Sequence, residues 1–231
     1  SYLVPGVDEN TIESFRAALD QGASHIETDT QATLDGIAVL FHDTNLLRLM
    51  SVDAKVSELT FAELSSYSLP NKGKVPSLDQ VLRELPGVML NIDVKSAGAV
   101  SPTVRAIEEN SAHDRVLVSS FSNTRRKRAL ALLSRPVATS GSMADVLRIW
   151  VAHKFLGGFG LKALTRGLNA LQLPCNYGPI LFAQPKFIAA MAAIDIEVHF
   201  WTINELEQMR ELLSMGVSGI VTDRCDLAAK L

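Results

Sequence analysis

The chain has 231 residues, of which 47% are hydrophobic, and its formal net charge is -3. This length suits one domain over residues 1–231, because a single α/β barrel takes about 250 residues. The near-neutral charge argues against a nucleic-acid partner, and the one basic run, residues 125–128, is expected to be a solvated helix face. No apolar run approaches the roughly 18 residues of a membrane span, so no stable membrane insertion is expected. The two cysteines, Cys175 and Cys225, are expected to be reduced thiols.

The first residues of the chain have neither the basic nor the apolar segment of a signal peptide. This favours a cytoplasmic location. The sequence does not begin with methionine, so a natural start upstream of Ser1, and with it secretion, stays open.

Apolar residues at helical spacing predict a first helix from Ile12, which ends at Gly22. Strict alternation then predicts a strand at 24–29, and a turn at Asp35-Gly36 precedes a return run that ends at His42. Residues 43–59 are expected to be a loop. Further helices are predicted at 61–64, 78–85, 100–107, 123–133, 144–155, 185–193 and 205–215, with a glycine-rich loop at 156–168.

Strands alternate with helices along most of the chain, which predicts a parallel sheet wrapped by helices. Without the return run, the predicted barrel strands are 24–29, 88–95, 115–119, 136–139, 170–173, 196–201 and 219–222. A closed barrel needs eight strands, because an open one leaves two edges unpaired. We therefore predict an α/β fold, a TIM (β/α)₈ barrel whose first strand lies upstream of Ser1.

The first predicted strand carries two acidic residues that share a face. Glu27 and Asp29 are two residues apart, and such carboxylates repel unless a cation or a proton lies between them. The following turn can fold the chain back so that His42 lies near them. An acidic pair followed by a histidine is typical of a hard-cation site with a proton shuttle. The alternatives are that His42 is a turn histidine bonded to backbone, and that Asp43 only caps the turn instead of orienting a histidine.

The strand at 88–95 has aliphatic residues on one face, whereas Asn91, Asp93 and Lys95 share the other. Such a strand suits a barrel wall with its polar face turned inward. The acids of both strands and Lys95 can also form a buried ion network without metal. That network leaves net negative charge inside the protein, which costs several kcal/mol per unpaired ion, so a bound cation is favoured.

Other candidates lie further along the chain. Gln172 ends a predicted strand and can reach a substrate there, and Trp201 ends another, where a site role and a core role compete. His25 is expected in the core, and His113 and His153 are expected on the surface as structural residues.

Together these motifs resemble the glycerophosphodiester phosphodiesterase family. The matching motifs are, in order, Glu9-Asn10-Thr11, Glu27-Thr28-Asp29, Asp35-Gly36, His42-Asp43, Asn91-Ile92-Asp93-Val94-Lys95, Ser119-Ser120-Phe121, Trp201-Thr202-Ile203-Asn204 and Gly216-Val217-Ser218-Gly219-Ile220-Val221-Thr222-Asp223. Each motif is weak alone, but their ordered succession over nearly the whole chain is specific.

The resemblance implies a (β/α)₈ barrel that hydrolyses a small-molecule glycerophosphodiester to an alcohol and glycerol phosphate. It implies that Mg²⁺ or Ca²⁺ is held by Glu27, Asp29 and Asp93. It also implies that His42 is one of two acid–base histidines, that Lys95 meets the phosphate, and that Trp201 lines the substrate mouth.

The sequence departs from the family pattern in three places. The family's first histidine and its neighbouring arginine are not among residues 1–231, and no other histidine here matches that position. Asp93 stands where glutamate is commoner, and Thr44, Asn45 and Leu47 replace the usual proline, threonine and aspartate. Two alternatives follow. One is a lysophospholipid or sphingolipid phosphodiesterase with an apolar rim from residues 156–168 or 175–183. The other is a degenerate barrel that binds phosphate esters without cleaving them.

Overall fold

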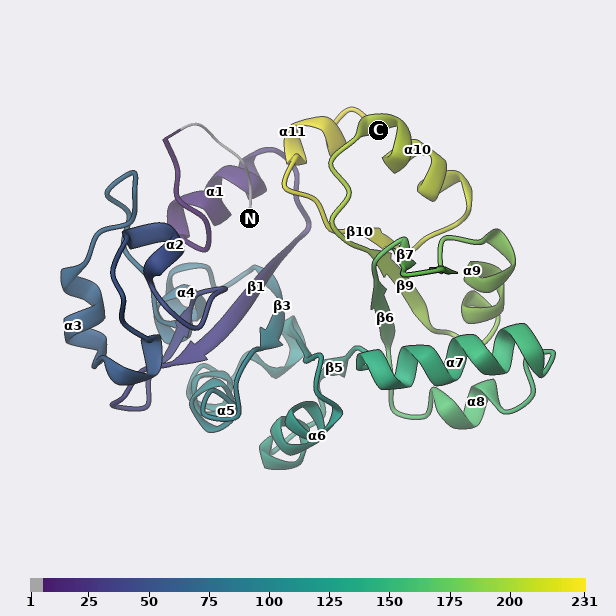
Figure 1. The fold of residues 1–231 in the computed structure, drawn as a ribbon, viewed down its shortest axis with the longest axis horizontal. Coiled ribbons are helices and arrows are strands. Elements are labelled where there is room, and N and C mark those ends of the chain that lie inside the picture. The colour runs from purple at the N-terminus through teal and green to yellow at the C-terminus, as the bar shows by residue number, and fades with distance from the viewer. Residues whose placement is uncertain (1–5) are drawn as a thin grey trace. The chain divides into compact units, whose positions relative to one another are not determined.

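The computed structural model describes residues 6–231, and the chain falls into two compact units, Ser1–Val137 and Ala138–Leu231. The first unit contains, in order, α1 (Ile12–Asp20), β1 (His25–Ala32), β2 (Ala38–Leu40), α2 (Leu47–Met50), η1 (Val56–Glu58), α3 (Phe61–Ser66), α4 (Leu78–Glu84), β3 (Met89–Val94), α5 (Val100–Glu109), η2 (Ala112–Arg115), β4 (Val116–Ser119) and α6 (Asn123–Leu132) (Figure 1). The second contains β5 (Ala138–Thr139), α7 (Met143–Phe155), α8 (Leu161–Leu164), β6 (Ala170–Leu173), β7 (Asn176–Tyr177), β8 (Ile180–Leu181), α9 (Pro185–Ala192), β9 (Glu197–Phe200), α10 (Leu206–Ser214), β10 (Gly219–Ile220) and α11 (Cys225–Ala228).

The seven strands predicted from alternation are all present as β1, β3, β4, β5, β6, β9 and β10, and the return run forms β2. The expected loop at 43–59 is partly helical, because its apolar residues pack into a buried cluster with β2 that includes Phe41, Leu46 and Val56. The loop expected at 156–168 contains α8, and a short hairpin, β7–β8, follows β6. The eighth strand, expected before Ser1, lies outside the described residues. Across residues 6–231, no helix has both the length and the apolar character needed to cross a bilayer.

In the first unit, β1 pairs antiparallel with β2 and parallel with β3, and β3 pairs parallel with β4. Figure 1 shows β1 and β3 running side by side. Their register sets Glu27 opposite Asn91 and Asp29 opposite Asp93. Paired residues of a parallel ladder point to the same side, so these four polar side chains form one patch on one face of the sheet.

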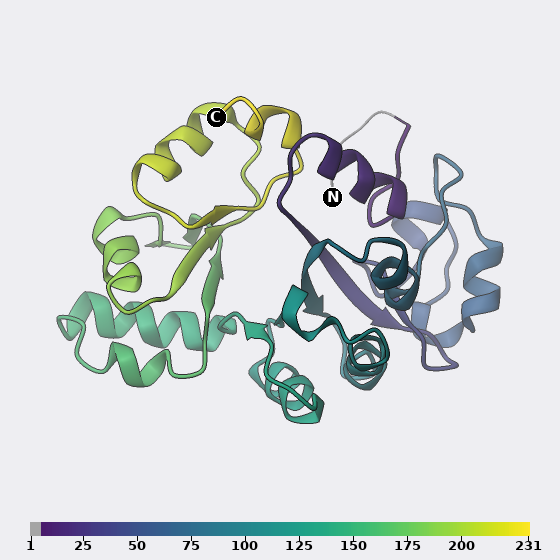
Figure 2. The same cartoon turned by 180° about the vertical axis from the view of Figure 1, so that it is seen from behind.

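The other face of these strands is covered by helices, as the alternation predicted. The aliphatic residues of β3, Leu90, Ile92 and Val94, are fully buried. On β1, Thr30 accepts a hydrogen bond from the hydroxyl of Thr103 in α5 at 3.0 Å. Figure 2 shows the same strands and helices from behind. Burial of the aliphatic face fixes which way the polar residues point.

In the second unit, β6, β9 and β10 form a parallel sheet, and a single bridge from Ser140 to Ala170 joins the segment after β5 to β6. Helices α7 and α9 supply much of the buried core that packs on this sheet. Gly219 on β10 lies beside His199, and an added Cβ would meet the imidazole Cδ2 at 2.9 Å, so no larger residue fits there without movement.

Candidate active site

The candidate site is built on the polar patch of β1 and β3. The side chains of Asp29 and Asp93 are less than a tenth exposed. Within the described residues, the side-chain Oδ1 atoms of Asn91 and Asp93 are buried without a hydrogen-bond partner. A buried polar atom without a partner costs about 1–3 kcal/mol, so two of them on neighbouring side chains indicate a place for a bound cation or water.

Lys95 follows the end of β3 and joins the two strands. Its Nζ lies 2.8 Å from Asp29 Oδ1 and 2.8 Å from Asp93 Oδ2. Burial opposes the charged form, but the two carboxylates outweigh it and raise the pKa of Lys95. The same ammonium lies 5.6 Å from the ring centroid of Phe121. Lys95 is therefore a fixed positive charge at the carboxyl end of β3, where substrates bind in barrels of this class.

The acids of the patch carry too much negative charge for one lysine to balance. Burial, followed by repulsion from Asp29, raises the pKa of Glu27 to about 8. Burial also raises the pKa of Asp93, although Lys95 acts in the opposite direction. Glu27 is therefore mostly protonated at neutral pH unless further positive charge is present.

Within residues 6–231, no three or more His, Cys, Asp or Glu side chains are grouped closely enough to hold a metal ion. The ammonium of Lys95 lies between Asp29 and Asp93, where a cation bound by both carboxylates would otherwise lie. The donor chemistry nevertheless fits a hard cation, because carboxylate and amide oxygens are its preferred ligands and two such oxygens lack partners. Of the acids predicted from the sequence, Asp29 and Asp93 lie together at Lys95, and Glu27 lies on the same face of the sheet opposite Asn91.

His42 lies two residues beyond the end of β2, next to Phe41, which is hydrogen-bonded to Asp29 of the acidic pair. The backbone N–H of Phe41 donates to the carbonyl of Asp29 at 3.1 Å, so the turn returns the chain as predicted. His42 Nδ1 lies 2.7 Å from Asp43 Oδ1. Burial opposes ionisation of Asp43, but hydrogen bonds from His42 and Arg48 outweigh it and lower its pKa. An ionised carboxylate only accepts, so Nδ1 carries the proton and Nε2 is the nitrogen that can accept one.

Arg48 links this histidine motif to the start of the chain. Its Nη1 and Nη2 donate to the two carboxylate oxygens of Glu9 at 3.0 and 2.6 Å, and its Nε donates to Asp43 Oδ2 at 2.5 Å. A two-pronged guanidinium–carboxylate bond restricts both groups. Glu9 and Arg48 therefore hold Asp43, and through it the ring of His42, in one orientation.

Each residue of the Glu9-Asn10-Thr11 motif makes a different structural hydrogen bond. Glu9 binds Arg48, and Asn10 accepts a hydrogen bond from the buried hydroxyl of Thr28 at 3.0 Å. Thr11 caps α1 by accepting a hydrogen bond from the backbone of Ser14. The motif thus joins the loop before α1 to the back of the strand that carries the acidic pair.

Three residues at this site were not predicted from the sequence. Asn91 lies on the polar face that alternation had identified, so its position beside the acids could have been predicted from the sequence. Arg48 lies in a segment expected to be a loop and gave no signal. Arg125 was expected on a solvated helix face, but its Nε donates to Ser120 Oγ at 3.0 Å and its charge acts to lower the pKa of Asp93. Its neighbour Arg126 is buried, so the expectation of a fully solvated basic run is wrong.

Gln172 and Trp201 belong to the second unit. Gln172 pairs in register with His199, and Trp201 follows β9 directly, so all three lie on one face of that sheet. The backbone N–H of Trp201 donates to the carbonyl of Leu173 at 2.9 Å. Both candidates therefore sit where their strands end, as predicted, and their substrate contacts stay a prediction.

Two of the minor histidine expectations are wrong. His25 is exposed because it begins β1 at the open end of the strand. His113 is buried, with its Nε2 3.1 Å from Glu108 Oε1 and its Nδ1 3.1 Å from Arg135 Nη2. His153 is half-buried, with its ring centroid 5.3 Å from that of Phe187.

The family model described as the glycerophosphoryl diester phosphodiesterase family matches residues 1–227. A Mycobacterium tuberculosis protein described as probable glycerophosphodiester phosphodiesterase 2 is 37% identical over 219 residues, covering 94% of this chain and 83% of that protein. The solved structure of a glycerophosphodiester phosphodiesterase from Agrobacterium tumefaciens matches with a TM-score of 0.78 at 20% identity, covering 96% of this chain and 92% of that one. An Oleispira antarctica phosphodiesterase in complex with the product sn-glycerol-3-phosphate also matches with a TM-score of 0.78 at 20% identity, over 98% of this chain and 92% of that one.

The structural matches confirm the predicted α/β barrel class of fold. The family model extends over nearly the whole chain, and a relative above 30% identity is aligned over most of both sequences. The chain belongs to the glycerophosphoryl diester phosphodiesterase family, a family of phosphoric diester hydrolases.

Proposed function

We propose that this chain hydrolyses glycerophosphodiesters to an alcohol and glycerol phosphate with the help of a divalent cation, Mg²⁺ or Ca²⁺. The observation that carries the proposal is the polar patch of β1 and β3, whose carboxylates face each other in register beside Lys95. Family membership supports the reaction class, and the match over residues 1–227 supports treating 1–231 as one catalytic domain.

In this proposal the cation is held by Glu27, Asp29 and Asp93, with the free amide oxygen of Asn91 beside them. When bound, the cation neutralises the negative charge that builds up on the phosphoryl oxygens. Lys95 contributes a second positive charge from the protein itself, placed to bind a non-bridging phosphate oxygen.

His42 is the proposed acid–base residue. With Nδ1 donating to Asp43, its Nε2 can take a proton from the attacking hydroxyl or, once protonated, give one to the leaving alkoxide. The Arg48 bond to Asp43 keeps this carboxylate ionised and oriented, so the ring presents the same nitrogen throughout. Trp201 and Gln172 are proposed to contact the substrate.

The test is turnover of soluble glycerophosphocholine by the natural full-length chain, followed as released glycerol phosphate, with chelator and after adding back Mg²⁺ or Ca²⁺. His42→Ala should lower kcat about 10²- to 10⁴-fold, because general acid–base groups contribute that much. His25→Ala is the matched control, since His25 is also exposed and bonded to a neighbouring side chain. Asp93→Asn should be inactive, whereas Asp114→Asn on the surface should not.

Undiminished turnover in the chelator, or normal turnover by His42→Ala, would refute the proposed mechanism. Binding of glycerol phosphate without any turnover of the diester would favour a non-catalytic binding barrel instead. Turnover of lysolipid micelles without turnover of soluble diesters would place the chain with lysolipid enzymes.

A further inference from the structure

The distribution of charge along the second unit is strongly uneven. Residues 146–194 contain five basic residues, Arg148, Lys154, Lys162, Arg166 and Lys186, and no acidic residue. The whole chain has 22 basic and 25 acidic residues, so the remainder has 17 basic against 25 acidic. A weakly acidic protein thus carries one segment that is purely cationic.

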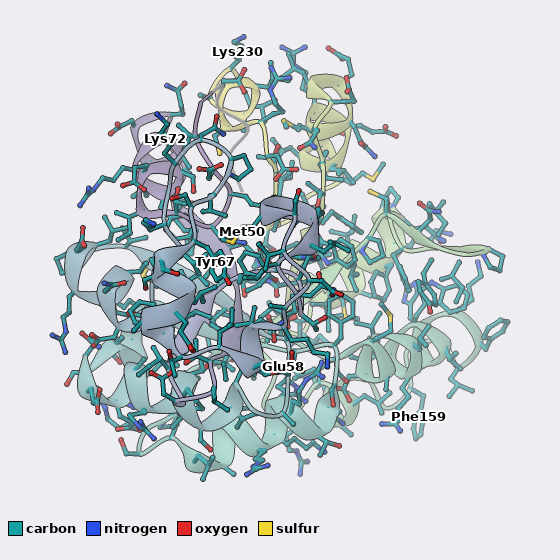
Figure 3. The ribbon with its side chains drawn as sticks, turned by 60° about the vertical axis from the view of Figure 1, so that its left-hand side comes forward. Met50, Glu58, Tyr67, Lys72, Phe159 and Lys230 are labelled. Carbon is teal, nitrogen blue, oxygen red and sulfur yellow. The ribbon has the colours of Figure 1, made fainter. Side chains whose placement is uncertain are left out.

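Among the described residues, the two most exposed large apolar side chains, Phe159 and Phe155, lie in the same segment, and Leu156 lies between them. Phe159 is 83% exposed, Phe155 is 70% exposed and Leu156 is 57% exposed. They occupy the end of α7 and the loop to α8, two helices that lie alongside each other in Figures 1 and 2. Phe159, labelled in Figure 3, projects outward from the ribbon. Soluble domains rarely expose contiguous large apolar groups without a binding role.

The loop backbone enforces this exposure. Gly157, Gly158 and Gly160 all have positive φ, and the N–H of Gly158 donates to the carbonyl of Ala152 at 3.0 Å. The N–H of Phe159 donates to the carbonyl of Leu156, also at 3.0 Å. This hydrogen-bonded turn therefore holds Phe159 away from the core.

Cations flank these apolar side chains. Lys154, Lys162 and Arg166 are exposed, and none of them forms an ion pair with another residue in 6–231. We define the α7–α8 tip as Val151, Lys154, Phe155, Leu156, Phe159, Lys162 and Arg166. On α7, Val151 and Phe155 are four residues apart and share a face. Apolar side chains beside unpaired cations are the pattern of a protein surface that inserts shallowly into an anionic lipid interface.

We propose that the α7–α8 tip docks the protein on anionic lipid bilayers. An anionic membrane attracts the unpaired cations and accommodates the aromatic and aliphatic side chains at the headgroup boundary, so both features of the tip are satisfied by one partner. A nucleic acid would use the cations but leave Leu156 and Phe159 in water. Helix α7 begins a few residues after the carboxyl end of β5 and leads back towards the start of β6, so its far end lies away from the carboxyl ends of the strands in this unit. The tip therefore shares no residue with the proposed catalytic machinery.

The experiment is co-sedimentation of the chain with vesicles of phosphatidylcholine, with and without about a third phosphatidylglycerol. Binding should require the anionic lipid and weaken at high salt. The Lys154→Gln/Lys162→Gln double variant should bind about 25-fold more weakly, since each cation near an anionic surface is worth about fivefold. The matched double variant Lys127→Gln/Arg128→Gln removes the same charge from exposed positions of α6 and should bind normally.

The apolar side chains of the tip are tested with a second matched pair of variants. Leu156→Ser should weaken binding about tenfold, whereas Leu132→Ser, at a site of α6 that is 50% exposed, should not. All four variants should keep their thermal unfolding midpoints and their turnover of soluble diester. Equal losses in tip and control variants, binding to neutral vesicles alone, or no vesicle binding would overturn the proposal. Retention on an acidic polypeptide but not on vesicles would also overturn it, in favour of a protein partner.

Discussion

Lys95→Met removes the ammonium between Asp29 and Asp93 while roughly keeping side-chain length. Both carboxylates are nearly buried, and each lies 2.8 Å from Nζ. Removing one partner of a buried ion pair costs about 3–5 kcal/mol, because the other charge stays buried without compensation. For a chain of this size each kcal/mol lowers the unfolding midpoint by about 2–4 °C. The variant should therefore unfold roughly 6–20 °C below the wild type at pH 7 in chelator.

The pH dependence of the stability that Lys95 contributes follows from its raised pKa. The contribution of Lys95 to the free energy of unfolding is complete below the unfolded-state pKa of lysine. It is lost only as the pH rises through the higher folded-state pKa, so a measurement at pH 7 includes all of it. Towards acid pH the deficit of Lys95→Met should shrink, since Asp93, whose pKa is raised, takes up a proton.

The assay is differential scanning calorimetry with chelator and with added Mg²⁺ or Ca²⁺. A cation should stabilise Lys95→Met more than the wild type, because it replaces the missing charge. Lys55→Met is the matched control: it breaks a 2.8 Å pair with Glu58 that is exposed on both sides, so water already solvates both charges and the unfolding midpoint should barely change. If Lys95→Met lost no more stability than this control, the coupling inferred between β1 and β3 would be wrong.

Two further predictions concern the same site. Because burial and Asp29 raise the pKa of Glu27 to about 8, cation binding at pH 7 should release a proton from this carboxyl. Calorimetric titration in buffers of different ionisation enthalpy measures this release, and an unchanged value in Glu27→Gln would contradict the assignment. Arg48→Lys keeps the charge but loses the two-pronged bond to Glu9, so kcat for glycerophosphodiesters should fall about tenfold. Arg16→Lys, at an exposed pair, is its control, and equal activities would show that Arg48 does not position His42.

Much of the candidate site was predictable because strand periodicity is local. Alternation alone put Glu27 and Asp29 on one face of a strand and Asp93 and Lys95 on one face of another, and the structure agrees. The turn after β1 predicted the return of the chain towards His42. Asn91 was visible in the same alternation, but nothing in the sequence showed that its amide oxygen would be buried without a partner.

Other parts depend on contacts between distant segments. Arg48 binds Glu9, which is 39 residues away in the sequence. No local pattern of charge predicts with which carboxylate a loop arginine will form an ion pair. Arg125 looked like part of a solvated run, and only the packing of α6 turned it towards the site. The acid-free stretch at 146–194 could be read from the sequence, whereas the exposure of Phe159 could not.

By itself the sequence determined the order of strands and helices, the face on which each polar residue lies, and the family to which its ordered motifs point. These follow from backbone periods of 2 and 3.6 residues, which act over a few neighbours. Tertiary structure decided the register that sets Asp29 beside Asp93, the bridging position of Lys95 and the orientation of His42 through Asp43 and Arg48. Those features arise from pairing between strands and loops far apart in the chain, where burial and charge balance select one arrangement among many.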